Sequence, residues 1–121
     1  MATLKTSVSL SSTDLTTGTL SSSTVKDITV TKGGILVKEI DGTAHTDAVV
    51  LLTASEHDEG TKVYIKNTHA SNVVYVKFTA GTTSELHIPA GGWAFFGWKA
   101  AVDMKIWPSA DNTFVEYGTF K

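Results

Sequence analysis

From residue 24 onward the chain alternates short apolar runs with turns rich in Gly, Pro, Asp and Asn, at intervals of roughly ten residues. This spacing is typical of a sandwich or barrel of short strands. No segment shows a convincing apolar period of about 3.6 residues, so we expect no long helix. The pattern predicts strands near residues 25–31, 35–40, 44–53, 62–67, 72–78, 84–88, 93–98, 102–107 and 113–120.

The first 26 residues have a different pattern, in which Ser and Thr dominate. Leu10, Leu15 and Leu20 recur at intervals of five, which fits neither a helix face nor a strand face. We expect an extended arm over residues 1–26 that docks through these leucines, either on its own sheet edge or on a neighbouring molecule. Residues 27–121 are then the folded domain, an all-β, antiparallel β-sandwich of the jelly-roll type with about eight short strands.

One hairpin is predicted residue by residue, with strand 62–67 folded back on strand 72–78 through a four-residue loop. Ile65 then faces Val74 on the apolar side. The opposite side carries Lys62, Tyr64, Lys66, Tyr75 and Lys77, with Tyr64 facing Tyr75 and Lys62 directly opposite Lys77. Facing lysines repel each other. This side is therefore either a solvated outer face with splayed lysines or a contact surface for an acidic partner.

The segment Gly91–Trp98 is aromatic on both alternating sides. Trp93 and Phe95 lie on one side, and Phe96 and Trp98 lie on the other. Residues 48–52 are apolar on both sides as well. Either both segments are central strands covered by loops and by the arm, or oligomerisation or docking on a larger body covers them. Trp107 is predicted on the outer face of its strand, as the best candidate for an exposed aromatic side chain.

Composition limits the possible functions. A chain of 121 residues has room for one modest core, and its lack of Cys excludes disulfides and thiolate chemistry. The ten basic residues are all Lys and the net charge is −2, so neither charge nor Arg forks favour nucleic acid. No apolar run exceeds six residues, and the N-terminus lacks a signal pattern. We expect a soluble chain that binds no membrane.

No catalytic or metal-binding motif is present. The four His lie at none of the usual metal-ligand spacings, and the chain has neither a Gly-x-Ser-x-Gly motif nor a phosphate-binding loop. The acidic turn Glu56–Glu59 lacks the order of a calcium loop, so we interpret it as solvated. We therefore expect no enzyme activity, no catalytic residues, no metal site and no cofactor.

Four segments resemble small virion proteins of tailed bacteriophages: Gly60–Thr68, Asn72–Val76, Ile88–Phe96 and Val115–Tyr117. The shared features are a strand ending in Lys-Asn-Thr, a Pro-Ala-Gly turn before aromatic residues, and a terminal Val-Glu-Tyr. The resemblance covers roughly residues 60 to 120. It implies a structural role in the virion.

The resemblance implies a capsid decoration, or cement, protein that sits on the outer shell as a homotrimer after synthesis in the host cytoplasm. It would clamp neighbouring subunits of the major capsid protein with its N-terminal arm. A receptor- or glycan-binding fibre-tip module, with Trp107 or the pair of tyrosines stacking on sugars, is an alternative. Another tail or collar subunit is a second alternative. The candidate interface residues are Leu10, Leu15, Leu20, Lys62, Tyr64, Lys66, Tyr75, Lys77, Trp93, Phe96, Trp98 and Trp107.

Overall fold

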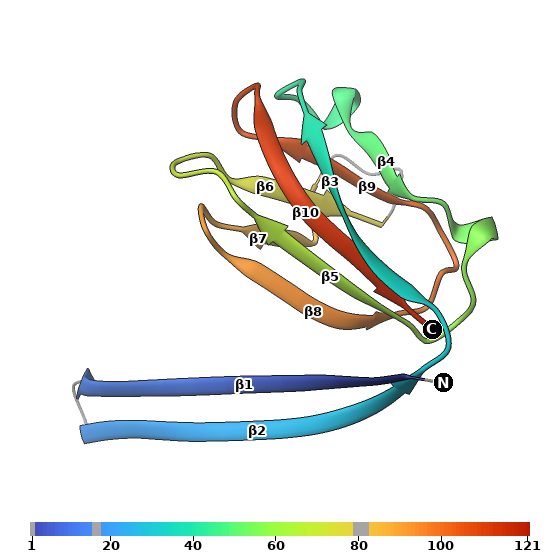
Figure 1. Ribbon diagram of the computed structural model, residues 1–121. Helices are drawn as coiled ribbons and strands as arrows, with labels where there is room; N and C mark the ends of the chain where they lie inside the picture. The colour runs from blue at the N-terminus through green and yellow to red at the C-terminus, as the bar shows by residue number, and fades with distance from the viewer. Residues whose placement is uncertain (1, 16–17, 79–82) are drawn as a thin grey trace. The chain divides into compact units, whose positions relative to one another are not determined.

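The computed structural model describes residues 2–15, 18–78 and 83–121, with the backbone alone at 14, 15 and 18–20 (Figure 1). The chain divides into two compact units, Met1–Thr31 and Lys32–Lys121. Across the described residues the regular structure is antiparallel strands and two short 3-10 turns, η1 (His45–Asp47) and η2 (Ala54–Glu56). The expected all-β class is confirmed.

The first unit is a two-stranded ribbon. Strand β1 (Ala2–Leu15) pairs antiparallel with β2 (Gly18–Val30), from Ala2 opposite Val30 to Leu15 opposite Gly18, with an irregularity between Ser12 and Leu15. The arm is therefore paired with itself instead of running as a single extended segment. The strand expected over 25–31 is the end of β2 and belongs to this ribbon.

The second unit is a sandwich of two four-stranded sheets. One sheet, called here the β5 sheet, has the order β3-β10-β5-β8, and the other, the β6 sheet, has the order β4-β9-β6-β7. Consecutive strands alternate between the sheets except at the β6–β7 hairpin, which is the connectivity of an eight-stranded jelly roll. The strands are β3 (Gly33–Ile40), β4 (Val49–Leu52), β5 (Thr61–Asn67), β6 (Val74–Lys77), β7 (Leu86–Ile88), β8 (Trp93–Trp98), β9 (Met104–Pro108) and β10 (Thr113–Phe120).

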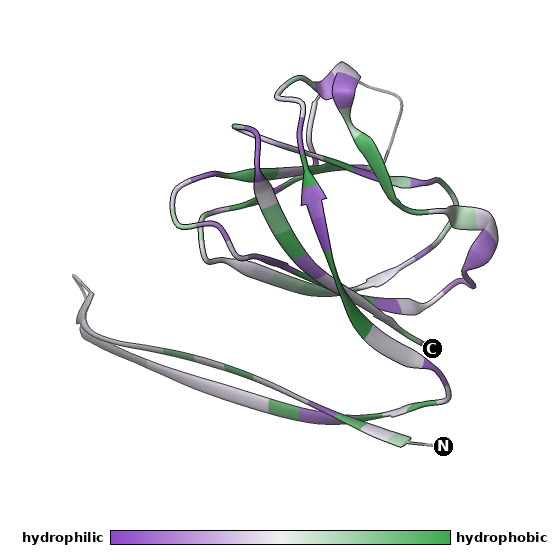
Figure 2. Ribbon diagram, turned by 45° about the horizontal axis from the view of Figure 1, so that its top comes forward, coloured by the Kyte–Doolittle hydropathy of each residue, from purple (hydrophilic) through white to green (hydrophobic). Residues whose placement is uncertain are grey.

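Buried apolar residues from both sheets form the core. Figure 2 shows hydrophobic residues along strands of both sheets, interspersed with hydrophilic ones. Strand β5 alternates between fully buried and half-buried residues along its whole length, as expected when one face of a strand meets a core. Strand β10 contributes Val115, which has no exposed surface. The other apolar side chains with no exposed surface are Val63, Ile65, Val74, Val76, Met104 and Ile106.

The predicted hairpin between strands 62–67 and 72–78 is wrong. β5 pairs with β10 and β8, whereas β6 pairs with β7 and β9, so the two strands lie in different sheets. Tyr64 consequently faces Phe95 rather than Tyr75, and Lys62 faces Gly97 rather than Lys77. The apolar alternation predicted the inward face correctly. It could not predict the partner, because an alternating strand offers the same face to any neighbour.

A buried amide holds the two sheets together where the chain crosses between them. Asn67, the last residue of β5, has no exposed surface. Its Nδ2 donates to the carbonyls of Asn72, Ile88 and Pro89 at 2.7, 3.1 and 3.2 Å. Its Oδ1 accepts the main-chain N–H of His69 at 3.0 Å. These bonds reach carbonyls just before β6 and at and just after the end of β7.

Two aromatic or aliphatic segments that were candidates for central strands lie instead at sheet edges. β8 closes one edge of the β5 sheet, and β4 closes one edge of the β6 sheet. The strand expected over 44–53 is shortened to Val49–Leu52, because residues 44–48 carry no large apolar side chain to anchor a strand. They form η1 instead, in which the Asp47 N–H donates to the Ala44 carbonyl.

Candidate interaction surface

The outer face of the β5 sheet exposes large apolar side chains, whereas a sheet face in contact with solvent is usually polar. Register places Val37, Glu116, Lys66 and Trp93 in one row across its four strands. The next row begins with Ile35 and continues through Gly118, Tyr64 and Phe95. Exposed fractions are 66% at Val37, 55% at Ile35, 53% at Trp93 and 44% at Phe114. We call this surface the outer apolar face.

One hydrogen bond orders the centre of the outer apolar face. The Tyr64 hydroxyl on β5 donates to Oε1 of Glu116 on β10, 3.3 Å away. Desolvation by burial raises the pKa of Tyr64 above its ordinary value, and the negative charge of Glu116 and this hydrogen bond raise it further. Tyr64 is consequently a neutral donor at physiological pH.

Lys62, Tyr64 and Lys66 lie together on this face as predicted, all three half-buried on β5. Tyr75 and Lys77 do not join them, since β6 belongs to the other sheet. Trp93 is exposed on the same face. Phe96 and Trp98 point inward from β8, and Trp98, only 5% exposed, contributes to the core rather than to a contact surface.

The outer face of the β6 sheet carries a row of three rings. Tyr75 stacks on Trp107 with ring centroids 5.3 Å apart, and His87 meets Tyr75 edge-on at 4.7 Å. The Lys77 ammonium lies 5.7 Å from the centre of the Trp107 ring, and Lys77 Nζ donates to the His45 carbonyl of η1 at 3.0 Å.

The prediction of an exposed Trp107 is wrong, because this side chain is only 7% exposed. Strand alternation placed it on the outer face correctly. The Tyr75 ring and the Lys77 side chain then cover it, and η1 packs against the same strand. Lys77, itself only 5% exposed, is likewise covered on this outer face, where it bonds to η1.

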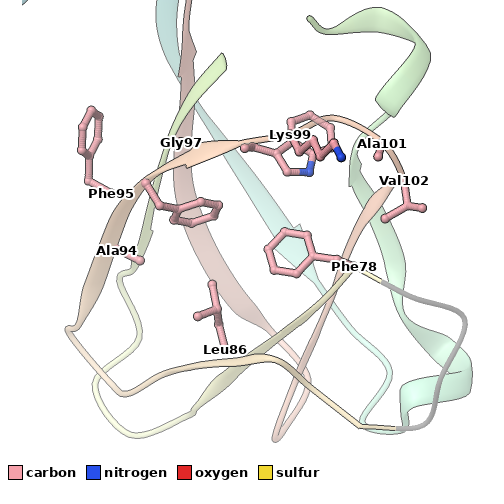
Figure 3. Close-up of a pocket in the computed structure, with 10 residues that line it drawn as sticks. Phe78, Leu86, Ala94, Phe95, Gly97, Lys99, Ala101 and Val102 are labelled. Carbon is pink, nitrogen blue, oxygen red and sulfur yellow. The ribbon is translucent and has the colours of Figure 1, made fainter. Parts of the chain in front are cut away.

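An apolar groove of about 610 Å³ opens beside β8, at the side of the sandwich where β7 lies (Figure 3). Phe78, directly after β6, and Leu86 of β7 line it, as does Phe96 of β8 in the other sheet. The Phe78 and Phe96 rings meet edge-on with centroids 6.1 Å apart. Lys99 is the one charged residue among its described lining residues. Sequence reasoning did not single out Phe78 or Leu86, because their strands were placed without their sheet partners.

One face of the β1–β2 ribbon, called here its apolar face, carries most of the large apolar side chains, together with Thr6 and Lys26. Leu4 lies opposite Ile28, and Val8 and Leu10 follow on the same face at every second or fourth residue. Leu10 is 56% exposed and Val8 is 38% exposed. The opposite face carries Ser and Thr with the pair Lys5 and Asp27, and Val25 is its apolar exception. The even spacing of residues 4, 8 and 10 indicates this face, whereas the five-residue spacing of Leu10, Leu15 and Leu20 does not.

Leu15 and Leu20 were predicted contacts as well. Both lie in strands of the ribbon, Leu20 opposite Ser12. Their side chains lie outside the described residues.

The His, Asp and Glu side chains in the part of the chain that is described form no metal-ligand cluster. No group of three or more His, Asp or Glu there could hold a metal ion. In the acidic turn, Asp58 pairs with Lys121, and His57 Nδ1 lies 2.9 Å from the Thr53 carbonyl. Over the same described ranges, no helix has the length and apolar character needed to span a bilayer.

Comparison of the chain with protein-family models, with curated proteins and with solved structures yields no match. Its surfaces are therefore the basis for a functional proposal.

Proposed function

We propose that this chain is a structural protein of a bacteriophage virion, a capsid decoration protein that assembles on the outer shell and clamps neighbouring major capsid subunits. The observation that carries the proposal is the apolar face of the β1–β2 ribbon, where Val8 and Leu10 are exposed. A lone two-stranded ribbon is at best marginally stable in water. Such a face gains stability only when a second surface covers it.

The fold is compatible with this role. Eight-stranded jelly rolls recur in viral capsid proteins and in lectins, which is support by analogy of fold alone. The outer apolar face provides a second apolar contact surface, on the sandwich, with Ile35, Val37, Trp93 and Phe114 exposed. Two apolar surfaces on one small chain suit a protein that contacts both its own copies and the shell. The chain then works as a homo-oligomer with the major capsid protein as its partner.

The test compares binding to capsids of the encoding phage that lack the decoration protein. Leu10→Lys places a charge on the apolar face of the ribbon, and Ser9→Lys places the same charge on its polar face, opposite Ser23. Burial of a leucine contributes about 1.5–3 kcal/mol, so Leu10→Lys is expected to weaken binding about tenfold or more. Ser9→Lys and wild type bind alike. Deletion of residues 1–26 abolishes binding, and unchanged binding of that deletion contradicts the proposal.

Glycan binding is a second candidate function, favoured by the exposed Trp93 ring on the outer apolar face. An exposed indole beside polar groups such as Lys66 offers a stacking platform for a sugar ring. This candidate predicts glycan binding that is lost in Trp93→Ala while capsid binding persists. A tail or collar role predicts binding to purified tails and not to heads.

A further inference from the structure

Strand β3 is an edge strand that carries a run of apolar residues. It pairs with β10 on one side and ends the β5 sheet on the other. Ile35, Leu36 and Val37 are 55, 62 and 66% exposed, the longest run of exposed large apolar residues in the described chain. Long apolar edges of this kind pair with other strands unless something protects them.

The free side of β3 offers a defined set of hydrogen-bonding groups. Lys32 and Lys121 exchange two main-chain hydrogen bonds, with N···O distances of 3.2 and 2.9 Å, at the start of the β3–β10 ladder. In an antiparallel ladder such pairs recur at every second residue. Residues 34, 36, 38 and 40 therefore bond to β10. The N–H and C=O groups of Gly33, Ile35, Val37 and Glu39 point to the free side.

We propose that β3 of one molecule pairs antiparallel with β3 of a second copy, with Leu36 on the two-fold axis. In this register Ile35 lies opposite Val37 of the second copy on the outer face. Gly33 then lies opposite Glu39, and Gly34 lies opposite Lys38, so no like charges face each other. The pairs 35–37 and 33–39 carry the outward hydrogen-bonding groups, which gives about eight new main-chain hydrogen bonds.

The neighbouring registers fit less well. A two-fold rotation keeps the outer face of the sheet continuous only when the axis passes through a residue. With Val37 on the axis, Ile35 faces Glu39 and Leu36 faces Lys38. With Lys38 on the axis, two lysine ammonium groups face each other. With Ile35 on the axis, Lys32 faces Lys38. Of these four registers, the one centred on Leu36 places apolar residues opposite each other with no like charges facing, so a second copy of the chain fits this edge.

Pairing in this register also explains the exposure of Leu36, which points to the inner side of the sheet. There it lines a cleft with Leu51, Leu52 and Tyr117 on the open side of the sandwich. The two Leu36 side chains would meet over this side and cover it. The inference rests on the homo-oligomer of the proposed function and names its surface and symmetry.

Because the chain has no Cys, single cysteine variants test the register directly. Residues on the axis of a non-hydrogen-bonded pair lie about 4.5 Å apart at Cα, within disulfide range, whereas diagonal neighbours lie near or beyond the limit of about 7 Å. Leu36→Cys of the full chain, oxidised with glutathione at micromolar concentration, is expected to give about tenfold more covalent dimer than Val37→Cys. Equal yields, or more dimer from Val37→Cys, overturn the register.

Light scattering separates this inference from the proposed function. Wild type is expected to have the mass of two chains or an even multiple. Val37→Lys is expected to lower the mass to that of one chain. The control Val25→Lys changes a strand residue of similar exposure and is expected to leave the mass unchanged. Far-ultraviolet circular dichroism checks that both variants fold. A trimer that Val37→Lys does not dissociate overturns the β3 pair and leaves the capsid proposal standing. A monomer that binds capsids overturns the pair as well.

Discussion

The side-chain amide of Asn67 on β5 donates to the carbonyl of Ile88 at the end of β7, 3.1 Å away, and so joins the two sheets of the sandwich. Asn67→Ala removes the side-chain donor to this carbonyl and to the carbonyls of Asn72 and Pro89. We expect a loss of about 3 kcal/mol in the free energy of unfolding, measured by urea denaturation. The matched control is Thr68→Val, which removes one exposed hydrogen bond to the Phe114 carbonyl and costs under about 1 kcal/mol. Equal losses would contradict a bridging role.

Trp107 is buried and Trp93 is exposed, so the two should contribute differently to the free energy of unfolding. Trp107→Ala removes a ring packed between Tyr75 and Lys77 and is expected to lower the free energy of unfolding by about 3–5 kcal/mol. Trp93→Ala alters an exposed ring and should cost about 1 kcal/mol or less. Thermal melts followed by circular dichroism compare the two. A Trp107→Ala protein as stable as wild type would contradict the conclusion that packing around this ring stabilises the fold.

Two glycines on the outer face of the β5 sheet make a matched pair. A Cβ added at Gly118 would overlap the Gly34 carbonyl oxygen of the paired strand, whereas a Cβ at Gly97 meets nothing within 4 Å. Gly118→Ala is expected to destabilise the protein by about 1–3 kcal/mol, because backbone must move. Gly97→Ala should stay within about 0.5 kcal/mol. The urea midpoints of the two variants measure this difference. A larger loss for Gly97→Ala than for Gly118→Ala would show that the β3–β10 backbone adjusts to the added Cβ at little cost.

The raised pKa of Tyr64 predicts a pH dependence of stability. Since the folded pKa lies above the unfolded value of about 10, the contribution is complete below pH 10 and is lost as the pH rises through the folded pKa. Glu116→Gln removes the nearby charge and should lower the Tyr64 pKa toward 10. Ultraviolet titration of tyrosinate measures this shift, with Tyr64→Phe identifying the signal. An unchanged titration in Glu116→Gln would leave burial as the sole cause.

The sandwich should fold without the ribbon. Its core residues all lie within Lys32–Lys121, so removal of residues 1–31 is expected to preserve cooperative thermal unfolding and amide signal dispersion. The isolated peptide 1–31 should be largely unstructured, because two strands alone bury little apolar surface. Circular dichroism of both pieces checks this. A truncated sandwich that fails to unfold cooperatively would show that the ribbon contributes to the core.

The alternation of apolar and polar residues was sufficient to predict most strands and the inward face of each. It placed Val63 and Ile65 inside and put Trp93 and Trp98 on opposite sides of their strand, because a strand in contact with one core shows its burial at every second position. The alternation could not predict which strands pair with each other. β5 and β6 follow each other in sequence yet lie in opposite sheets, since the bonds of Asn67 favour a crossing where the pattern allowed a hairpin.

The apolar face of the ribbon and the groove at Phe78 and Phe96 were not predicted. Each is made by residues from different strands, and neither has a local motif. Trp107 illustrates the same limit within one residue. Its strand position was correct, and its burial depends on Tyr75 and Lys77 of the neighbouring strand.

The sequence by itself determined an all-β chain with a Ser- and Thr-rich leading segment, the approximate strands, and an excess of apolar surface. These follow from local preferences and from period-two burial, which neighbouring residues encode. Only the tertiary structure decided which strands are neighbours, that the arm pairs with itself, and that β3 is left as an apolar edge. Those features depend on contacts between residues far apart in the chain, whose energies no local pattern contains.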